Sequence, residues 1–222
     1  MKNAHLLRTV LIWDMDGTLI DSSEGILGSV RLTVQELGLP PVPETRIREF
    51  IGPPLQHSFH RLCGLPEAEA QRATEIYREH YAAQGIRQAR VYDGLLDALE
   101  RSAAMGVRHA VATNKKQDAA EEVCRIFGLD RFIDMVQGNN IMGDRRKSDM
   151  ILQCLQHFGA KRTDALMIGD SIYDARGAEG AGVDFLAALY GFGFASPDDL
   201  ADIPHAGMIF SPEGLLPFLT GA

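Results

Sequence analysis

The spacing of apolar and polar positions changes several times along the chain. Val10–Trp13 is an apolar run without alternation, which predicts a strand buried on both faces, as in a parallel sheet. Beyond Leu19 the apolar residues recur at helical spacing, and breakers such as Gly52-Pro53-Pro54 interrupt them. We expect a series of helices in this stretch and no strand between residues 20 and 86. The predicted helices are Ser22–Leu37, Pro43–Phe50, Leu55–Leu62 and Pro66–Gln84.

From Val91 onward, strand-like and helix-like segments alternate. The predicted strands are Val107–Ala112, Ile133–Val136, Ala165–Ile168, Val183–Leu189 and Met208–Phe210. The predicted helices are Leu95–Met105, Gln117–Phe127, Ser148–Phe158, Asp174–Gly180 and a short one from Pro212. This alternation implies right-handed βαβ crossovers and a parallel sheet, hence an α/β fold with a Rossmann-like core. Because the first strand precedes the helical block and its partners follow it, the block is an insertion. We therefore expect a core domain of residues 1–19 and 87–222 and an α-helical cap domain of residues 20–86.

The composition and net charge of the chain argue against several kinds of protein and of binding partner. The chain has 222 residues, of which 45% are hydrophobic, enough for a proper core. Its net charge of −8 argues against a nucleic-acid or anionic-membrane partner. Its start lacks the apolar region of a signal peptide, and its cysteines, Cys63, Cys124 and Cys154, show no disulfide or zinc spacing. We expect a cytoplasmic protein.

Acidic residues follow two of the predicted buried strands. Asp14 and Asp16 come directly after Val10–Trp13, and Asp170 and Asp174 follow Ala165–Ile168. In open α/β sheets, sites lie beyond the carboxyl ends of the strands, so these carboxylates are expected close together. Turn formation after a strand and capping of a helix are the alternative explanations. Carboxylates so arranged predict an oxygen-lined cation site suited to Mg²⁺.

Two further segments add polar groups to the same edge of the sheet. Thr113-Asn114-Lys115 follows a predicted strand and is expected to form a turn into the next helix, able to hold an anion. Taken alone, this segment is better explained as an ordinary helix cap. Arg145-Arg146-Lys147 precedes another helix, and one of these cations is expected to project into the site while the others are solvated.

Taken in order, these motifs resemble those of the haloacid dehalogenase superfamily. The resemblance rests on Asp14-Met-Asp-Gly-Thr-Leu19, Thr113, Lys147 and Gly169-Asp170 with Asp174, and the helical insertion resembles the small α-helical cap of that family. Phe50-Ile-Gly-Pro-Pro-Leu55 and Tyr190-Gly-Phe-Gly193 resemble the phosphoglycolate phosphatase-like branch. Ser148 stands where many relatives have proline after the lysine, which leaves Arg146 as an alternative to Lys147.

The resemblance implies a role for each of these residues. Asp14 would be the nucleophile that forms an aspartyl-phosphate, and Asp16 the acid and base that protonates the leaving oxygen and then activates water. Lys147 would supply a cation. Mg²⁺ would be held by Asp14, the backbone carbonyl of Asp16, Asp170 and Asp174. The implied substrate-binding residues are Thr18, Thr113, Asn114 and Gly52.

The implied function is a Mg²⁺-dependent phosphatase of a small phosphate monoester resembling 2-phosphoglycolate. Nucleoside monophosphates and pyrophosphate are alternative substrates, a sugar phosphomutase is an alternative activity, and a non-catalytic binding protein is the remaining alternative. Asp16 argues against a dehalogenase, whose leaving halide needs no proton. The lack of lysine between Ile20 and Ile86 argues against a phosphonatase. The expected partner is a small phosphorylated metabolite, and the oligomeric state is left open.

Overall fold

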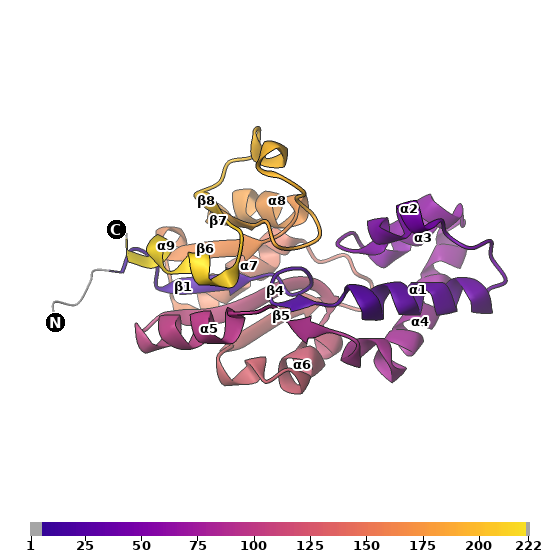
Figure 1. The fold of residues 1–222 in the computed structure, drawn as a ribbon, viewed down its shortest axis with the longest axis horizontal. Helices are drawn as coiled ribbons and strands as arrows, with labels where there is room; N and C mark the ends of the chain where they lie inside the picture. The colour runs from indigo at the N-terminus through magenta and orange to yellow at the C-terminus, as the bar shows by residue number, and fades with distance from the viewer. Residues whose placement is uncertain (1–5, 221–222) are drawn as a thin grey trace. The chain divides into compact units, whose positions relative to one another are not determined.

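The computed structural model describes residues 6–220 and divides the chain into two compact units (Figure 1). One unit contains the chain up to Ile20 and from Val91 onward, and the other is Asp21–Arg90. The helices predicted between residues 20 and 86 are found in the second unit. Its role as a cap stays a prediction.

The first unit is built on a six-stranded sheet with the strand order β5-β4-β1-β6-β7-β8. Every neighbouring pair of these strands is parallel. The strands are β1 Val10–Trp13, β4 Arg108–Lys116, β5 Met135–Asn139, β6 Ala165–Gly169, β7 Asp184–Ala188 and β8 Gly207–Ile209. The predicted α/β class and parallel sheet are confirmed, with strand ends displaced by a few residues.

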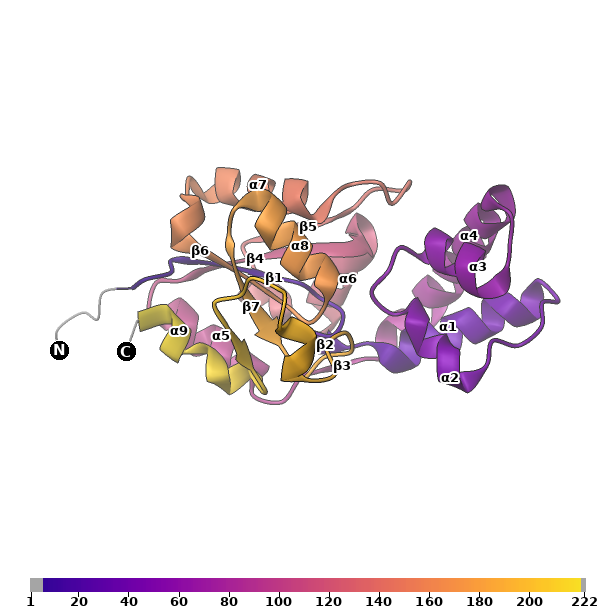
Figure 2. The same ribbon diagram turned by 90° about the horizontal axis from the view of Figure 1, so that it is seen from above.

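Helices cover both faces of this sheet (Figures 1 and 2). On one face lie α5 Leu95–Ala104 and α6 Gln117–Ile126; on the other lie α7 Lys147–Phe158 and α8 Ile172–Ala181. A short C-terminal helix, α9, spans Pro217–Thr220. Coverage of both faces explains why the strands are apolar runs without alternation.

The central strand, β1, decides which way the first acidic residue points. Val10 and Ile12 belong to the apolar cluster that α7 and α8 form with the sheet. Successive strand residues alternate between faces, so Leu11 and Trp13 lie on the α5 side. Asp14 continues the alternation of Val10 and Ile12, so its side chain points from the end of β1 toward α7 and α8.

The second unit consists of short helices around an aromatic core. Its elements are α1 Ser23–Glu36, α2 Glu44–Ile47, α3 Leu55–Cys63 and α4 Glu67–Ala83. The helix predicted over Pro43–Phe50 is instead α2 followed by a 3₁₀ turn, Arg48–Phe50. Phe50 and Phe59 pack edge to face with ring centroids 5.0 Å apart. The two segments that join the units, β2 Ile20–Asp21 and β3 Arg90–Val91, pair with each other in a small sheet. The expectation of no strand from residue 20 onward is therefore wrong at Ile20–Asp21, because this pairing involves residues distant in sequence.

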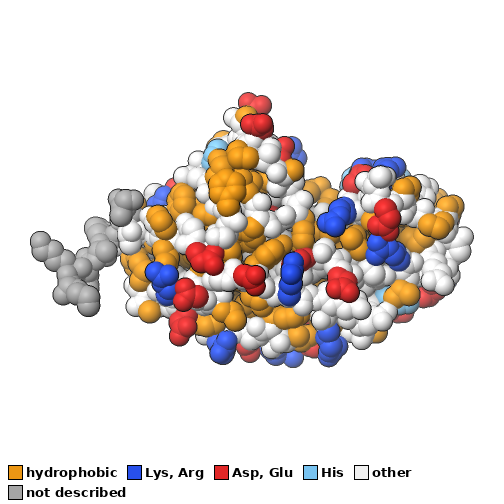
Figure 3. Space-filling model, in the orientation of Figure 1, with side chains coloured by type: hydrophobic (Ala, Val, Ile, Leu, Met, Phe, Trp, Pro, Cys, Tyr) orange, Lys and Arg blue, Asp and Glu red, His pale blue; other side chains and the backbone are white. Residues whose placement is uncertain are grey.

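Acidic and basic side chains are interspersed over the face drawn in Figure 3. Among residues 6–220, no helix is both long and apolar enough to cross a bilayer.

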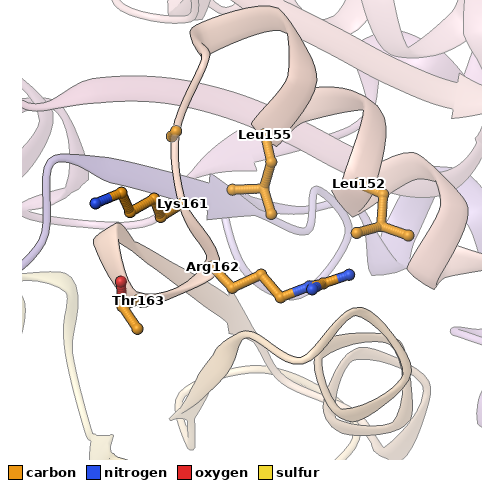
Figure 4. A pocket seen from close by; sticks show the side chains of 6 residues that line it. Leu152, Leu155, Lys161, Arg162 and Thr163 are labelled. Atoms are coloured by element: carbon orange, nitrogen blue, oxygen red, sulfur yellow. The ribbon is translucent and has the colours of Figure 1, made fainter.

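A surface hollow of about 500 Å³ lies between the end of α7 and the start of β6 (Figure 4). Leu152 and Leu155 project into it from α7, and Lys161, Arg162 and Thr163 line it from the following loop. Since β6 begins at Ala165, the hollow lies at the end of the strand opposite Asp170. It is therefore separate from the acidic residues.

A buried histidine joins β1 to α5. The Trp13 indole N–H donates to His109 Nδ1 at 3.1 Å, so the proton of the neutral ring is on Nε2, which faces Ser102 Oγ at 3.2 Å. The Ser102 hydroxyl donates to the carbonyl of Ala98 at 2.6 Å and can thus accept from His109. Burial lowers the pKa of His109 from 6.5 to about 4, although Asp134 opposes this effect.

We predict that His109 weakens the fold in acid. Between pH 6.5 and about 4 the unfolded chain binds a proton here that the folded chain does not, so the free energy of unfolding falls as the pH falls. The full effect is about 3 kcal/mol. In urea unfolding followed by circular dichroism from pH 7.5 to pH 4.5, His109→Gln should show a shallower loss of stability than the wild type. The exposed His57 supplies the control variant, His57→Gln. Parallel pH profiles for wild type and His109→Gln would contradict this assignment.

Candidate active site

Asp14 and Asp16 leave β1 in a tight turn. Gly17 adopts a left-handed φ of +85°, and its N–H donates to the carbonyl of Ile20 at 2.9 Å. The carbonyl of Met15 accepts from the N–H groups of Leu19 and Ile20, at 2.9 and 3.1 Å. This closed turn fixes the backbone on both sides of Asp16.

The carboxylates of Asp14, Asp170 and Asp174 form a buried cluster. One oxygen of each residue lies within 4.8 Å of the others. Lys147 Nζ contacts two of them, at 2.7 Å from Asp14 Oδ1 and 2.8 Å from Asp174 Oδ1, and it donates to the carbonyl of Ala112 at 2.9 Å. The ends of β1 and β6 and the starts of α7 and α8 therefore supply one polar centre at the edge of the sheet.

Lys147, rather than Arg146, reaches this cluster. Lys147 is the first residue of α7, and its side chain is 5% exposed. It passes over Gly177 of α8, where a Cβ atom would lie 2.4 Å from Lys147 Cγ. The Arg146 side chain is 83% exposed and lies 3.8 Å from Asp149. The close approach of α7 and α8 at Gly177 thus decides which cation is buried.

Asp174 both caps a helix and faces the cluster. Helix α8 begins at Ile172, two residues before the predicted start, which makes Asp174 its third residue. The hydroxyl and N–H of Ser171 donate to Asp174 Oδ2 at 2.7 and 3.1 Å. The other oxygen, Oδ1, meets Lys147. The capping explanation for Asp174 is therefore confirmed through Oδ2, and its role as a cation ligand stays a prediction.

The crowded carboxylates hold protons more tightly than usual. Burial raises the pKa of Asp14 to about 6, and the charge of Asp174 adds to this effect, while the charge and hydrogen bond of Lys147 oppose it. Burial, Asp174 and Asp14 together raise the pKa of Asp170 to about 8. Burial alone lowers the pKa of Lys147, but Asp14 and Asp174 raise it above its ordinary value. A further positive charge would relieve this repulsion, and buried carboxylate oxygens are the donors that Mg²⁺ takes. The residues present therefore fit such a cation.

Thr113 and Asn114 do not form the predicted turn. β4 continues to Lys116, and its pairing with β5 resumes at Lys116 opposite Asn139 after a register shift beyond Ala112. The predicted turn is therefore wrong, because β4 continues up to α6. That these residues bind an anion stays a prediction. Thr113 is buried, and its hydroxyl oxygen accepts from the N–H of Lys115 at 3.2 Å.

The extended chain brings in a residue that sequence reasoning missed. Lys115 Nζ lies 3.0 Å from Asp16 Oδ2, and the two side chains are only 7% and 16% exposed. Lys115 lies within the register shift between Ala112 and Lys116. The sequence carried no clear signal for its place in the site, because the assumed turn would have ended the strand before it. The site thus contains two buried lysines, each paired with an aspartate of the first motif.

The other residues predicted to bind substrate lie in three different parts of the structure. Thr18 is fully buried, and its Oγ1 has no hydrogen-bond partner among the described residues. Asn114 is partly buried in β4. Gly52 belongs to the second unit, where it has a φ of +101° and open space around its Cα. The catalytic and substrate-binding roles of all these residues stay predictions.

Comparison with known proteins places the chain in a family. Residues 11–188 match the haloacid dehalogenase-like hydrolase family. The chain belongs to this family. The resemblance predicted from the motifs is thereby confirmed, and the protein is a hydrolase of the haloacid dehalogenase superfamily.

Individual relatives of this hydrolase carry different names. It is 37% identical to a 5'-nucleotidase of Pseudomonas aeruginosa over 90% of both chains. It is 33% identical to the tyrosine-protein kinase PtkA of Mycobacterium bovis, over 90% of this chain and 69% of that protein. A phosphoglycolate phosphatase of Aquifex aeolicus is 27% identical over 82% of this chain and 85% of its own length.

A solved structure agrees with the fold. A haloacid dehalogenase-like family hydrolase from Streptococcus pneumoniae superposes with a TM-score of 0.86 and is 31% identical, over 95% of this chain and 98% of that one.

We predict that Asp170→Asn stabilises the metal-free protein at pH 8. The variant keeps an oxygen that can accept hydrogen bonds and removes a charge that burial and its neighbours disfavour. A carboxyl whose pKa is raised on folding makes the wild type more stable as the pH falls below about 8, because the folded chain then binds the proton first. The advantage of the variant should therefore shrink toward pH 5.

Thermal unfolding in EDTA at pH 8, 6.5 and 5 measures this advantage. Asp97→Asn, at an exposed residue of α5, is the control and should leave the pH profile unchanged. An Asp170→Asn protein less stable than the wild type at pH 8 would show that the carboxylate is not under electrostatic strain.

Proposed function

We propose that this hydrolase is a Mg²⁺-dependent phosphatase that cleaves a small phosphate monoester through an aspartyl-phosphate. The observation that carries the proposal is the buried cluster of Asp14, Asp170 and Asp174 with Lys147 bound across two of them. A strand end that presents a carboxylate beside a buried lysine is suited to nucleophilic attack on an anionic group.

The residues divide the chemistry between them. Asp14 attacks phosphorus and forms the covalent intermediate, while Lys147 holds its carboxylate in place at 2.7 Å. Asp16 gives a proton to the leaving oxygen and later takes one from the water that cleaves the intermediate. Lys115, paired with Asp16, adds positive charge beside the incoming phosphoryl group. Thr113 and the backbone N–H groups around the turn are the proposed hydrogen-bond donors to the phosphoryl oxygens.

The residues that would hold the cation are Asp14, the backbone carbonyl of Asp16, Asp170 and Asp174. When bound, Mg²⁺ supplies positive charge that offsets the repulsion between the carboxylates and the substrate dianion. Asp174 is constrained by Ser171, which orients it from outside the cluster.

The proposed substrates are small. A compound resembling 2-phosphoglycolate is our first candidate, supported by the motifs and by the phosphoglycolate phosphatases among the relatives. A nucleoside 5'-monophosphate is the second, because the 5'-nucleotidase is 37% identical over 90% of the chain. The kinase relative makes transfer to an acceptor other than water an activity to include in any assay. We propose a cytoplasmic location.

We predict that activity depends on Asp14 and on the cation. Asp14→Asn keeps the shape of the side chain but removes the nucleophile, so phosphate release should fall by about 10⁴-fold or more. EDTA should abolish release from the wild type, and added Mg²⁺ should restore it. Phosphate release from 2-phosphoglycolate, nucleoside 5'-monophosphates, pyrophosphate and p-nitrophenyl phosphate, ranked by kcat/KM, measures both effects.

Asp97→Asn is the matched control for this charge removal and should retain full activity. Unchanged turnover by Asp14→Asn, or full turnover in EDTA, would refute the proposed mechanism.

We propose that the second unit selects the substrate. The core motifs contact only the phosphoryl group, so discrimination between esters requires other residues. Gly52 follows Arg46 and Arg48 in the chain, and Arg46 is itself bound to Glu49 at 3.1 Å. The rigid turn Gly52-Pro53-Pro54 is thus our candidate for contact with the part of the substrate beyond the phosphate.

We predict that Gly52→Leu reorders the substrates. The ratio of kcat/KM between 2-phosphoglycolate and p-nitrophenyl phosphate should change by about tenfold, since a bulky side chain would alter contacts with one ester more than the other. Gly64→Leu is the matched control, because Gly64 also has a left-handed φ (+69°) and no atom near its Cβ position. An equal loss on every ester, or the same change in both variants, would argue against selection at Gly52.

A further inference from the structure

The loop that follows β7, Tyr190–Gly193, lies against the acidic cluster but has no part in the proposed chemistry. We propose that this loop is a positioning element that fixes the Asp170 carboxylate for the cation. The inference rests on the proposed Mg²⁺ site and concerns only how the chain orients one of its ligands.

Backbone groups of the loop hold one oxygen of Asp170. The N–H groups of Phe192 and Gly193 donate to Asp170 Oδ2 at 2.7 and 3.1 Å. The N–H of Phe194 donates to the carbonyl of Asp170 at 2.9 Å, which anchors the main chain of the same residue. Since two donors occupy Oδ2, the carboxylate cannot rotate without losing both bonds, and Oδ1 is the oxygen free of these donors.

The loop approaches so closely that side chains are excluded. A Cβ atom on Gly191 would lie 2.3 Å from Asp170 Cβ and 2.3 Å from the carbonyl oxygen of Gly17. A Cβ atom on Gly193 would lie 2.6 Å from the carbonyl oxygen of Asp170. Gly191 therefore packs its backbone between the ends of β1 and β6, and any side chain there must displace one of them.

Tyr190 ties the loop to the first motif. Its hydroxyl donates to the carbonyl of Thr18 at 3.0 Å, and its ring packs against Tyr92 with centroids 4.8 Å apart. The loop is thus fastened at Tyr190 to the turn that carries Asp16 and at Phe192 to Asp170. These two attachments fix the distance between Asp170 and the turn that carries Asp16, which are far apart in the sequence and meet only in the folded chain.

If the loop Tyr190–Gly193 fixes Asp170, a change in the loop should weaken the binding of the cation. Groups that orient a ligand from outside the metal site typically change metal affinity by about 10- to 100-fold when removed. Displacing Asp170 costs affinity because Mg²⁺ demands a near-ideal arrangement of its ligands. Tyr190→Phe removes a single hydrogen bond and keeps the ring, so its effect should have the same direction and be smaller.

The experiment compares Mg²⁺ binding with stability in the same proteins. Calorimetric titration of the metal-free wild type, Tyr190→Phe and Gly191→Ala with MgCl₂ gives the affinity, and thermal unfolding in EDTA gives the stability. We expect Gly191→Ala to weaken Mg²⁺ binding by about 10- to 100-fold. Gly28→Ala is the matched control, because the Cβ position of Gly28 is 3.5 Å from its nearest neighbour.

Each outcome decides between a positioning role and a merely structural one. Weaker Mg²⁺ binding by variants that unfold at the wild-type temperature in EDTA supports the proposal. Wild-type affinity in folded variants overturns it, whatever their melting temperatures. If Gly191→Ala does not fold, or binds more weakly and also unfolds at a lower temperature, Tyr190→Phe decides alone. Weaker binding by Tyr190→Phe at the wild-type melting temperature supports the proposal, and any other result for this variant counts against it. A wild type that binds no Mg²⁺ refutes the proposed cofactor, whereas tight binding by wild type and variants alike refutes only the role of the loop.

Discussion

The site depends on electrostatic repulsion between buried carboxylates. Asp14, Asp170 and Asp174 converge from separate elements, and burial together with the neighbouring carboxylates raises the pKa of Asp14 and of Asp170, so that their charged forms are disfavoured in the absence of a further cation. Lys147 offsets part of the repulsion by contacting two of the three. The other hydrogen bonds of the site keep these charged groups in place.

Different elements meet that constraint in different ways. Ser171 holds one oxygen of Asp174 from the start of α8, and backbone N–H groups after β7 hold one oxygen of Asp170. Asp170 and Asp174 are thus each held through one oxygen by groups outside the cluster. Asp14 and Asp170 cannot separate to reduce their repulsion, because the strands that they follow, β1 and β6, are hydrogen-bonded neighbours in the sheet. Repulsion that cannot be relieved by movement is what favours a cation.

The sequence allowed the sheet and its acidic edge to be predicted, because both follow from local pattern and chain order. Buried strands are apolar runs, and parallel strands end at a common edge, so Asp14 and Asp170 were expected together. Lys115 was not expected, because the extension of β4 depends on pairing with β5 through a register shift that local sequence does not record. The choice between Lys147 and Arg146 required the close contact of α7 and α8 at Gly177. His109 gains its neutral, buried state only from Trp13 and Ser102, which lie on other elements.

The pairing of β1 also has a consequence for biosynthesis. Val10 pairs with Arg108 on one side and with Ala165 on the other, so the central strand is made well before either of its neighbours. During synthesis, the apolar segment Val10–Trp13 leaves the ribosome long before either partner strand exists. The helices of residues 21–90 emerge in this interval and depend mostly on contacts within their own unit. β4 can cover one edge of β1 once the chain has passed Lys116, but the other edge stays open until the chain has passed Ile168. An open strand edge can associate with other chains, so chaperone demand should be greatest before both partners exist.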